Sequence, residues 1–141
     1  VFSNRGLAGI DGTIATATGV AQIAARDGFD GKTRVLLGDL TLLHDAGSLA
    51  YNQADAIEKN LEIQLVVAND FGGSIFTGLE MAKTLDSASF DKLFRTPQSV
   101  DLWHLAAAYG WQYLLVETVG DLETALASSG RILIEVRLES A

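Results

Sequence analysis

The chain has 141 residues, of which 48% are hydrophobic and 20% are charged, and its net charge is −8. This size and composition are typical of one globular domain with a hydrophobic core. The negative charge disfavours general binding to nucleic acid or to an anionic membrane, because both need a basic surface. The lack of cysteine excludes disulfides, thiolate zinc sites and cysteine nucleophiles. No hydrophobic run approaches the roughly 20 residues of a membrane span, and no signal-peptide pattern opens the chain, so we expect a cytoplasmic protein.

The first half of the chain alternates between strand and helix patterns. A short strand is predicted at 1–3, and a glycine-rich loop follows it as far as Gly12. Hydrophobic residues recur at helical spacing from 14 to 24, and Asp11 is a candidate cap for that helix. Apolar runs predict strands at 33–37 and 61–68, each buried on both faces, with a weaker helix at 45–56 between them. Because the chain starts without methionine inside a predicted strand, we expect a piece of a longer protein.

The second half continues the alternation after an irregular stretch. Residues 70–98 show only a short helix pattern near 89–94. Ser99 or Asp101 then caps a predicted helix that continues to Tyr109. A strand at 113–117, a helix at 122–127 and a last strand at 131–138 complete the chain. Strands alternating with helices predict a single α/β domain over residues 1–141, with a mostly parallel sheet of about five to six strands and helices on both faces.

Polar residues follow two of the predicted strands at the point where each ends. Asp39 comes after the strand at 33–37, and Asn69 comes after the strand at 61–68. The interval fits one βαβ crossover, which brings both residues to the carboxyl edge of a parallel sheet, where ligands bind. Mg²⁺ prefers oxygen ligands of this kind. Either residue alone is more often an ordinary turn or capping residue, so a non-catalytic α/β binding module is an alternative.

At these positions the sequence resembles a known family. Gly38-Asp39-Leu40, followed by Asn69-Asp70, resembles the cofactor motif of thiamine-diphosphate enzymes, usually written GDG…NN. The Gly-Asp-Leu-Thr variant at 38–41 resembles one branch, as do Ser-Asn-Arg-Gly-Leu-Ala-Gly-Ile-Asp-Gly at 3–12 and Gly-Gly-Ser-Ile-Phe at 72–76. That branch comprises the menaquinone-pathway synthases, transferases that join 2-oxoglutarate to isochorismate with loss of carbon dioxide. The resemblance covers nearly the whole chain and implies their carboxy-terminal, diphosphate-binding domain, with the thiamine-diphosphate-binding fold. An acetolactate-synthase-like enzyme of the same superfamily is an alternative.

The resemblance implies a metal site. Mg²⁺, or Mn²⁺ in its place, would bind to the side chains of Asp39 and Asn69 and to the backbone carbonyl of Phe71. Family members often carry glycine or asparagine at the position of Phe71. If that position needs a glycine-like backbone conformation, Phe71 is strained there.

The resemblance also implies cofactor and substrate contacts. The diphosphate would meet backbone N–H groups around Gly38, Asp39, Leu40 and Thr41, and Ile10 would hold the thiamine ring system in its bent form. On the substrate side, Arg5 would pair with a carboxylate of the substrate, for which its planar guanidinium is well shaped, and Ile75 and Phe76 would line the pocket.

No residue of this chain is expected to be catalytic. In the family, the glutamate that activates the cofactor belongs to the amino-terminal domain of a partner subunit. The expected partners are therefore the missing amino-terminal domains, a second subunit of the same homo-oligomer and the two small-molecule substrates. We expect the chain alone to fold but not to catalyse. Its least stable part should be residues 71–96, whose apolar residues have few obvious partners.

Overall fold

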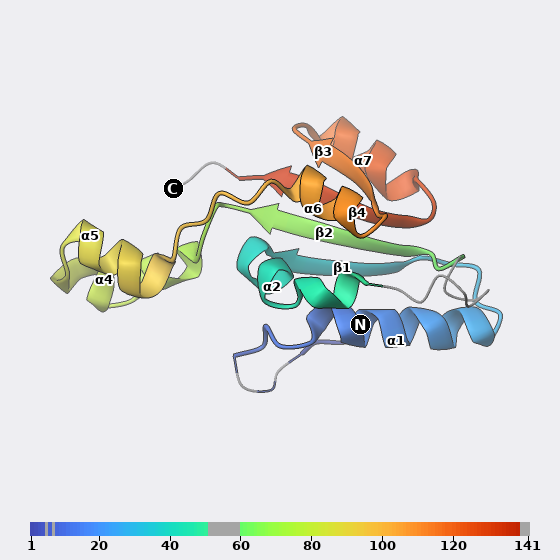
Figure 1. Ribbon diagram of the computed structural model, residues 1–141, viewed down its shortest axis with the longest axis horizontal. Coiled ribbons are helices and arrows are strands. Elements are labelled where there is room, and N and C mark those ends of the chain that lie inside the picture. The colour runs from blue at the N-terminus through green and yellow to red at the C-terminus, as the bar shows by residue number, and fades with distance from the viewer. Residues whose placement is uncertain (5, 7, 51–59, 139–141) are drawn as a thin grey trace.

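The computed structural model describes residues 1–4, 6, 8–50 and 60–138. Its central feature is a sheet of four parallel strands in the order β1-β2-β4-β3 (Figure 1). The strands are β1 (Thr33–Gly38), β2 (Ile63–Asn69), β3 (Gln112–Val116) and β4 (Arg131–Arg137). The helical elements are α1 (Thr13–Arg26), α2 (Asp39–His44), η1 (Ala46–Leu49), η2 (Ser74–Gly78), α4 (Met81–Thr84), α5 (Ser87–Phe90), η3 (Asp91–Arg95), α6 (Leu102–Ala108) and α7 (Val119–Ala127).

The predicted α/β class and the parallel sheet are confirmed, with fewer strands than expected. Within the described residues the sheet has four strands instead of five to six, and residues 1–3 form no strand. The four internal strand predictions agree with β1 to β4 to within about two residues. The predicted crossover is also present, because β1 and β2 are parallel neighbours in a register that runs from Thr33↔Ile63 to Gly38↔Ala68.

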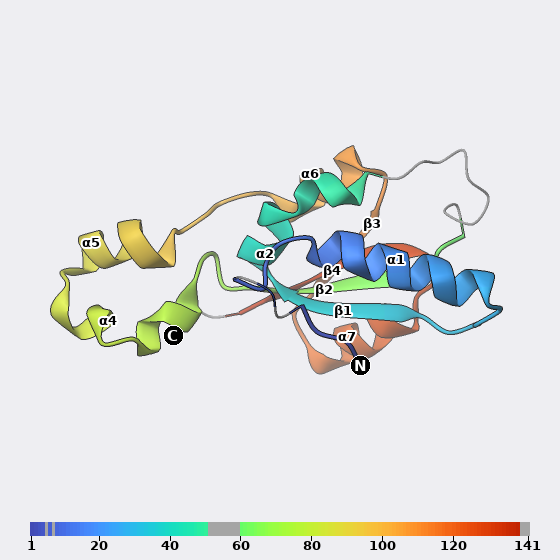
Figure 2. The same ribbon diagram turned by 90° about the horizontal axis from the view of Figure 1, so that it is seen from below.

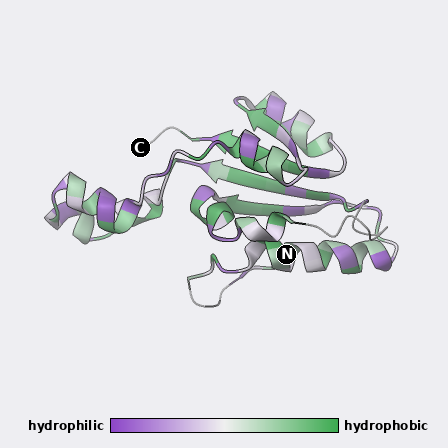
Figure 3. Cartoon of the chain, in the orientation of Figure 1, coloured by the Kyte–Doolittle hydropathy of each residue, from purple (hydrophilic) through white to green (hydrophobic). Residues whose placement is uncertain are grey.

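Helices cover both faces of the sheet. In Figure 2, α1, α2 and α6 lie on one face and α7 lies on the other. Strand β2 supplies side chains to both, because alternate residues of a strand point to opposite faces. Its Ile63, Leu65 and Val67 belong to the larger cluster beneath α1, α2 and α6, while Val66 packs against the smaller cluster beneath α7. Figure 3 shows β2 as a mostly hydrophobic strand, in line with this two-sided burial.

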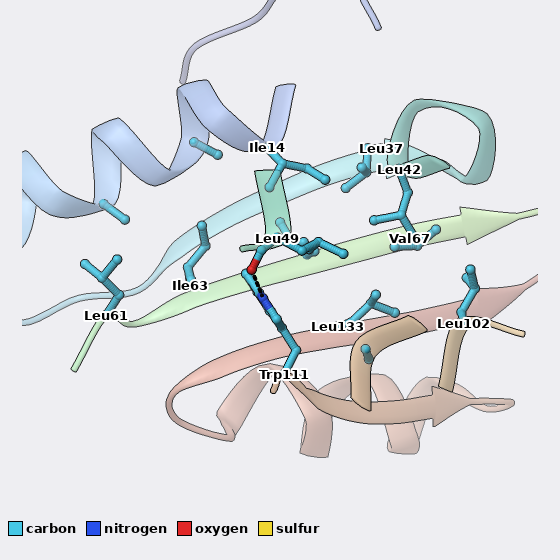
Figure 4. Close-up of a cluster of buried hydrophobic side chains, with 14 residues drawn as sticks. Ile14, Leu37, Leu42, Leu49, Leu61, Ile63, Val67, Leu102, Trp111 and Leu133 are labelled. Carbon is cyan, nitrogen blue, oxygen red and sulfur yellow. Dashed lines mark hydrogen bonds between the residues drawn. The ribbon is translucent and has the colours of Figure 1, made fainter. Parts of the chain in front are cut away.

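The larger cluster is closed by an aromatic residue. Trp111, just before β3, is buried, and its Nε1 donates to the carbonyl of Leu49 at 2.9 Å (Figure 4). The indole therefore buries its apolar surface without leaving its N–H unpaired. This contact holds η1 against the segment that leads into β3.

Strand β1 differs from its prediction. A strand buried on both faces was expected, but β1 lies at the sheet edge, where exposed residues alternate with partly buried ones and only Leu37 is fully buried. Leu37 belongs to the larger cluster, whereas Leu36 is 78% exposed. An apolar run alone does not distinguish a central strand from an edge strand whose second face is open.

The start of α1 is capped by a residue distant in sequence. The N-cap Gly12 has φ 61° and offers no side chain, so the prediction that Asp11 caps this helix is wrong. Asp45 does so instead, because its Oδ2 accepts from the backbone N–H groups of Ile14 and Ala15 at 2.7 and 3.2 Å. The prediction for α6 is confirmed, since Asp101 accepts from the backbone N–H of His104.

The segment between β2 and α6, residues 70–98, projects from the carboxyl end of β2, and we call it the arm (Figure 1). Its outgoing and returning segments meet at the base, where the N–H of Gly73 donates to the carbonyl of Arg95 at 2.7 Å. A Cβ at Gly72 would lie 2.8 Å from that same carbonyl oxygen, so the approach requires glycine.

The arm is less open than its composition predicted. Three of its phenylalanines pack together: the rings of Phe90 and Phe94 stack at 5.6 Å, and Phe76 lies 6.5 Å from Phe94. Ile75 and Leu79 are exposed. The expected helix at 45–56 begins with the short η1, after α2 has already ended at His44, and its positions 51–56 lie outside the described residues. None of the described helices has the length and apolar character to cross a membrane.

Candidate functional site

Asp39 and Asn69 lie side by side at the carboxyl edge of the sheet. Asp39 is the first residue of α2, directly after β1, and Asn69 is the last residue of β2. Gln98 lies between them, and its Nε2 donates to Asp39 Oδ2 at 2.7 Å and to Asn69 Oδ1 at 3.2 Å. The two oxygen atoms are therefore no farther apart than the sum of those distances. Both side chains are buried, so their contact with Gln98 lies beneath the protein surface.

The third oxygen of the predicted metal site is bound by the same residue. The backbone N–H of Gln98 donates to the carbonyl of Phe71 at 3.1 Å. One residue thus provides N–H donors to all three oxygens that the sequence predicted as metal ligands. Donors and cations satisfy the same lone pairs, so the oxygens of Asp39 and Asn69 face one position that favours positive charge, and the Phe71 carbonyl faces the backbone of the same residue.

The charge balance at Asp39 is unusual for a buried carboxylate. Burial raises the pKa of the Asp39 carboxyl, and the hydrogen bond from Gln98 only partly offsets this rise. Among the described residues Asp39 forms no ion pair. A buried carboxylate without a cationic partner is costly, and a bound cation would supply that partner.

Asn69 has a second set of partners behind it. Its Nδ2 donates to Oε1 of Glu135 at 2.9 Å. Glu135 is buried in the middle of β4, and it also accepts hydrogen bonds from the Tyr113 hydroxyl and from Arg137 Nε. Burial acts to raise the pKa of Glu135, but the hydrogen bonds from Tyr113, Arg137 and Asn69 outweigh it and hold that pKa below its ordinary value. Glu135 is therefore ionised, with each carboxylate oxygen hydrogen-bonded.

The strain expected at Phe71 is present. Phe71 has φ 61°, in the left-handed region that favours glycine or asparagine. Its N–H donates to Asn69 Oδ1 at 3.0 Å, and its carbonyl accepts from Gln98. The carbonyl of Phe71 thus faces the backbone of Gln98, whose side chain contacts the other two predicted ligands.

The predicted cofactor residues lie beside an open groove. Gly38 and Thr41 line a groove of about 870 Å³ bounded by α1, β1 and the amino-terminal segment, a size in the range of small-molecule sites. Among the described residues, only the two chain neighbours of Gly38 come near the Cβ that it lacks, so space is open there. Leu40 and Thr41 belong to the first turn of α2, where backbone N–H groups have no carbonyl acceptor within the helix, and the Leu40 N–H bonds to the Asp39 carboxylate. Ile10 is half-buried in the loop before α1.

The predicted substrate residues are less closely placed. Arg5 lies outside the described residues. Ile75 and Phe76 belong to η2 in the arm, where Ile75 is exposed and the ring of Phe76 packs toward Phe94. Their roles at a substrate pocket stay predictions.

The sequence reading missed Gln98 and Glu135. A signal for Glu135 is present, because a lone carboxylate interrupts the apolar run at 132–136 and such a residue is rarely buried without a partner. Gln98 follows a proline in an irregular segment, and no sequence pattern singles it out. Among the described residues no three His, Cys, Asp or Glu side chains gather as a metal site. The predicted site uses one carboxylate, one amide and one backbone carbonyl, and so differs from such a cluster.

The comparison with known proteins gives close relatives. No family model matches the chain. It is 52% identical over 143 residues to the 2-succinyl-5-enolpyruvyl-6-hydroxy-3-cyclohexene-1-carboxylate synthase of Clavibacter michiganensis, covering 98% of this chain and 24% of that protein. The synthase of the same name from Thermobifida fusca is 43% identical over 141 residues, covering 100% of this chain and 24% of the relative. The chain thus spans about a quarter of the length of these relatives.

A solved structure shares the fold. The benzoylformate decarboxylase from Polynucleobacter necessarius superposes with a TM-score of 0.73 over 94% of this chain and 24% of its own, at 21% identity. The resemblance predicted from the motifs is therefore confirmed. Nearly the whole length of this chain is similar to a stretch that makes up about a quarter of the length of 2-succinyl-5-enolpyruvyl-6-hydroxy-3-cyclohexene-1-carboxylate synthases.

Proposed function

We propose that this chain is the carboxy-terminal, diphosphate- and Mg²⁺-binding domain of a thiamine-diphosphate-dependent synthase of menaquinone biosynthesis. The whole enzyme would decarboxylate 2-oxoglutarate and add the resulting succinyl-semialdehyde carbanion to isochorismate. Supporting this are the similarity to synthases whose name describes the product and the match of the motifs at 38–41 and 69–76 to that branch.

The observation that carries the proposal is the arrangement around Gln98. Three oxygens, from Asp39, Asn69 and Phe71, converge on the N–H donors of one residue. An acid oxygen, an amide oxygen and a carbonyl oxygen form a donor set that suits Mg²⁺, and Mn²⁺ takes the same ligands. These residues would hold the metal, and diphosphate oxygens would complete its shell.

The diphosphate would extend from that metal toward Gly38 and Thr41, which line the open groove. Thiamine diphosphate, when bound, supplies the carbanion chemistry, and the protein supplies binding and orientation. Within this chain, Leu40 and Thr41 would contribute backbone N–H groups, and Ile10 would support the cofactor. Arg5, Ile75 and Phe76 are proposed to contact substrate.

The rest of the site would come from outside this chain. We propose that the activating glutamate lies in an amino-terminal domain of a second subunit, so that a cytoplasmic homo-oligomer forms the complete site. The 141-residue chain alone would then bind no substrate productively and would show no decarboxylation.

The test uses the whole enzyme with thiamine diphosphate and Mg²⁺. Mass spectrometry should detect the synthase product from 2-oxoglutarate and isochorismate, and Arg5→Ala should raise the KM for a carboxylate substrate while cofactor affinity stays near normal. Formation of acetolactate from pyruvate instead would identify a different member of the superfamily. Failure to bind thiamine diphosphate at all would support a non-catalytic module and overturn the proposal.

A further inference from the structure

Glu135 is a buried carboxylate that the proposed chemistry does not use. It lies in the apolar run of β4, on the same face of the sheet as Leu133, and it is 2% exposed. Its oxygens accept from Asn69 Nδ2, from Arg137 Nε, both at 2.9 Å, and from the Tyr113 hydroxyl. A carboxylate in an apolar strand is costly to keep, so its retention calls for a role that a hydrophobic residue would not fill.

The contacts of Asn69 fix which way its amide faces. A carboxylate can only accept a hydrogen bond, so the group that faces Glu135 must be the NH₂ of Asn69. A backbone N–H can only donate, so the group that faces Phe71 N must be the amide oxygen. Both contacts therefore require the same orientation, with Oδ1 turned toward Asp39 and Gln98.

We propose that Glu135 is the positioning residue of the metal site: it holds the Asn69 amide with its NH₂ buried and its oxygen presented beside Asp39 Oδ2. This rests on the proposed function. Glu135 itself does not touch the metal, because it contacts the far side of Asn69. It acts as the supporting partner behind a ligand, a type of residue whose loss typically weakens metal binding by about 10–100-fold.

The proposal explains why an amide occupies position 69. A carboxylate there would be an equally good or better oxygen ligand for a divalent cation. Opposite Glu135, however, it would place two buried acceptors in contact with no proton between them, and the like charges would repel. An amide gives one side a donor and the other an acceptor, which the two neighbours of Asn69 require.

The test exchanges the amide at position 69 and the carboxylate at position 135 in the whole enzyme. Asn69→Asp, Glu135→Gln and the double variant are compared with wild type, and the affinity for Mn²⁺ in the presence of thiamine diphosphate is measured by electron paramagnetic resonance. Asn69→Asp should weaken binding by about 10–100-fold. Glu135→Gln should change it only severalfold, because a glutamine oxygen still accepts from Asn69 while its NH₂ donates to Tyr113. The double variant has the charge of wild type and a reversed donor–acceptor pair, so it should recover part of the loss. Recovery should be incomplete because Arg137 Nε shares Oε1 of Glu135 with Asn69 and must turn away from the new NH₂ toward solvent.

A purely structural role would not give this pattern. If Glu135 served only folding, the double variant would be no better than Asn69→Asp alone, and the inference would be overturned. It would also be overturned if Asn69→Asp bound Mn²⁺ as tightly as wild type. Tyr113→Phe is the matched control, because it removes one partner of Glu135 without touching Asn69, and it should leave Mn²⁺ affinity unchanged.

Misfolding of Asn69→Asp, or a wild-type enzyme that does not bind Mn²⁺, would each lead to a different conclusion. Should Asn69→Asp fail to fold, Glu135→Asp keeps the charge but withdraws the carboxylate by one methylene, and it should bind Mn²⁺ severalfold more weakly; unchanged affinity would contradict the inference. If wild-type enzyme binds no Mn²⁺ with thiamine diphosphate, the proposed function fails and the inference fails with it. If wild type binds and only the exchange pattern is absent, the inference alone fails.

Discussion

Strand β2 carries a buried amide near each end, and the two are satisfied in different ways. At the amino end, Gln64 accepts from Arg34 Nε at 2.8 Å and donates to carbonyls near the end of α7, including that of Ser128 at 2.7 Å. At the carboxyl end, the oxygen of Asn69 accepts from Phe71 N and from the side chain of Gln98. Gln64 is thus enclosed by backbone groups and a cation, whereas Asn69 faces a side chain that comes from the arm.

The difference shows where the fold leaves room for a ligand. The carbonyls at the end of α7 are helix-terminal groups that need donors, and Gln64, Arg34 and Lys32 provide them. At that end of the sheet these carbonyls are therefore already hydrogen-bonded within the chain. At the other end, a side-chain amide occupies the position between Asp39 and Asn69, and an amide side chain can leave when a cation arrives.

The largest effect should follow from removing the Asp39 carboxylate, which lies beside the carboxyl end of β2. Asp39→Ala removes the only formal charge among the three predicted ligands, so the whole enzyme should lose Mg²⁺-dependent retention of thiamine diphosphate, by more than the roughly 100-fold typical of a supporting residue. Folding should persist, because the variant removes a buried carboxylate that has no cationic partner.

Cofactor content after gel filtration, with and without Mg²⁺, measures this effect. Asp39→Asn is the matched control, since it keeps the size and one oxygen but not the charge, and its loss should be intermediate. Normal retention in Asp39→Ala would remove this residue from the metal site.

At the amino end of β2, replacing the buried amide should lower the stability of the protein and leave ligand binding unchanged. Gln64→Leu leaves the helix-terminal carbonyls and Arg34 without their buried partner, at a cost of about 2–3 kcal/mol in the free energy of unfolding. Urea denaturation measures this loss. Thiamine diphosphate and Mg²⁺ should bind the folded variant with unchanged affinity. A weakened cofactor site in Gln64→Leu would mean that the two ends of β2 are not independent.

These two ends also differ in how far the sequence predicted them. The crossover between β1 and β2 followed from two apolar runs about thirty residues apart, and it brings Asp39 and Asn69 to the same edge of the sheet. Those runs could not show that β1 is an edge strand, since exposure of Leu36 depends on what covers the other face. Gln98 was not predictable, because its contact with Asp39 spans 59 positions and depends on the path of the arm. Long-range contacts made by irregular segments have no periodic signature.

Gln98 offers a smaller and more specific test. Its amide donates to both Asp39 and Asn69, so a metal that binds these oxygens must displace it. Gln98→Ala removes this competitor while keeping the backbone N–H that binds the carbonyl of Phe71. A hydrogen bond to a charged group contributes about 1.5–3 kcal/mol, and the lower end of this range corresponds to a rise in Mg²⁺ affinity of about tenfold, which is the effect we expect.

Titration calorimetry with Mg²⁺ in the presence of thiamine diphosphate measures this change. Ser99→Ala, at the neighbouring exposed residue, is the control and should have no effect. A fall in affinity on Gln98→Ala would show that Gln98 supports the loaded site instead of competing with the metal.

The smallest effect concerns Phe71, which holds the third predicted ligand in a strained conformation. Its φ of 61° is costly for a residue with a large side chain, by about 1–2 kcal/mol, whereas asparagine tolerates it well. The side chain is 37% exposed, so its replacement gives up little burial. Phe71→Asn should therefore stabilise the protein by about 0.5–1 kcal/mol, and thermal unfolding should show a midpoint higher by about 1–4 °C. Phe71→Ala is the matched control, because it loses the same ring but keeps the unfavourable φ, and it should give no gain. Mg²⁺ affinity should stay constant in both variants, since the ligand at this position is a backbone carbonyl. Equal stability of the two variants would show that the left-handed backbone costs nothing here.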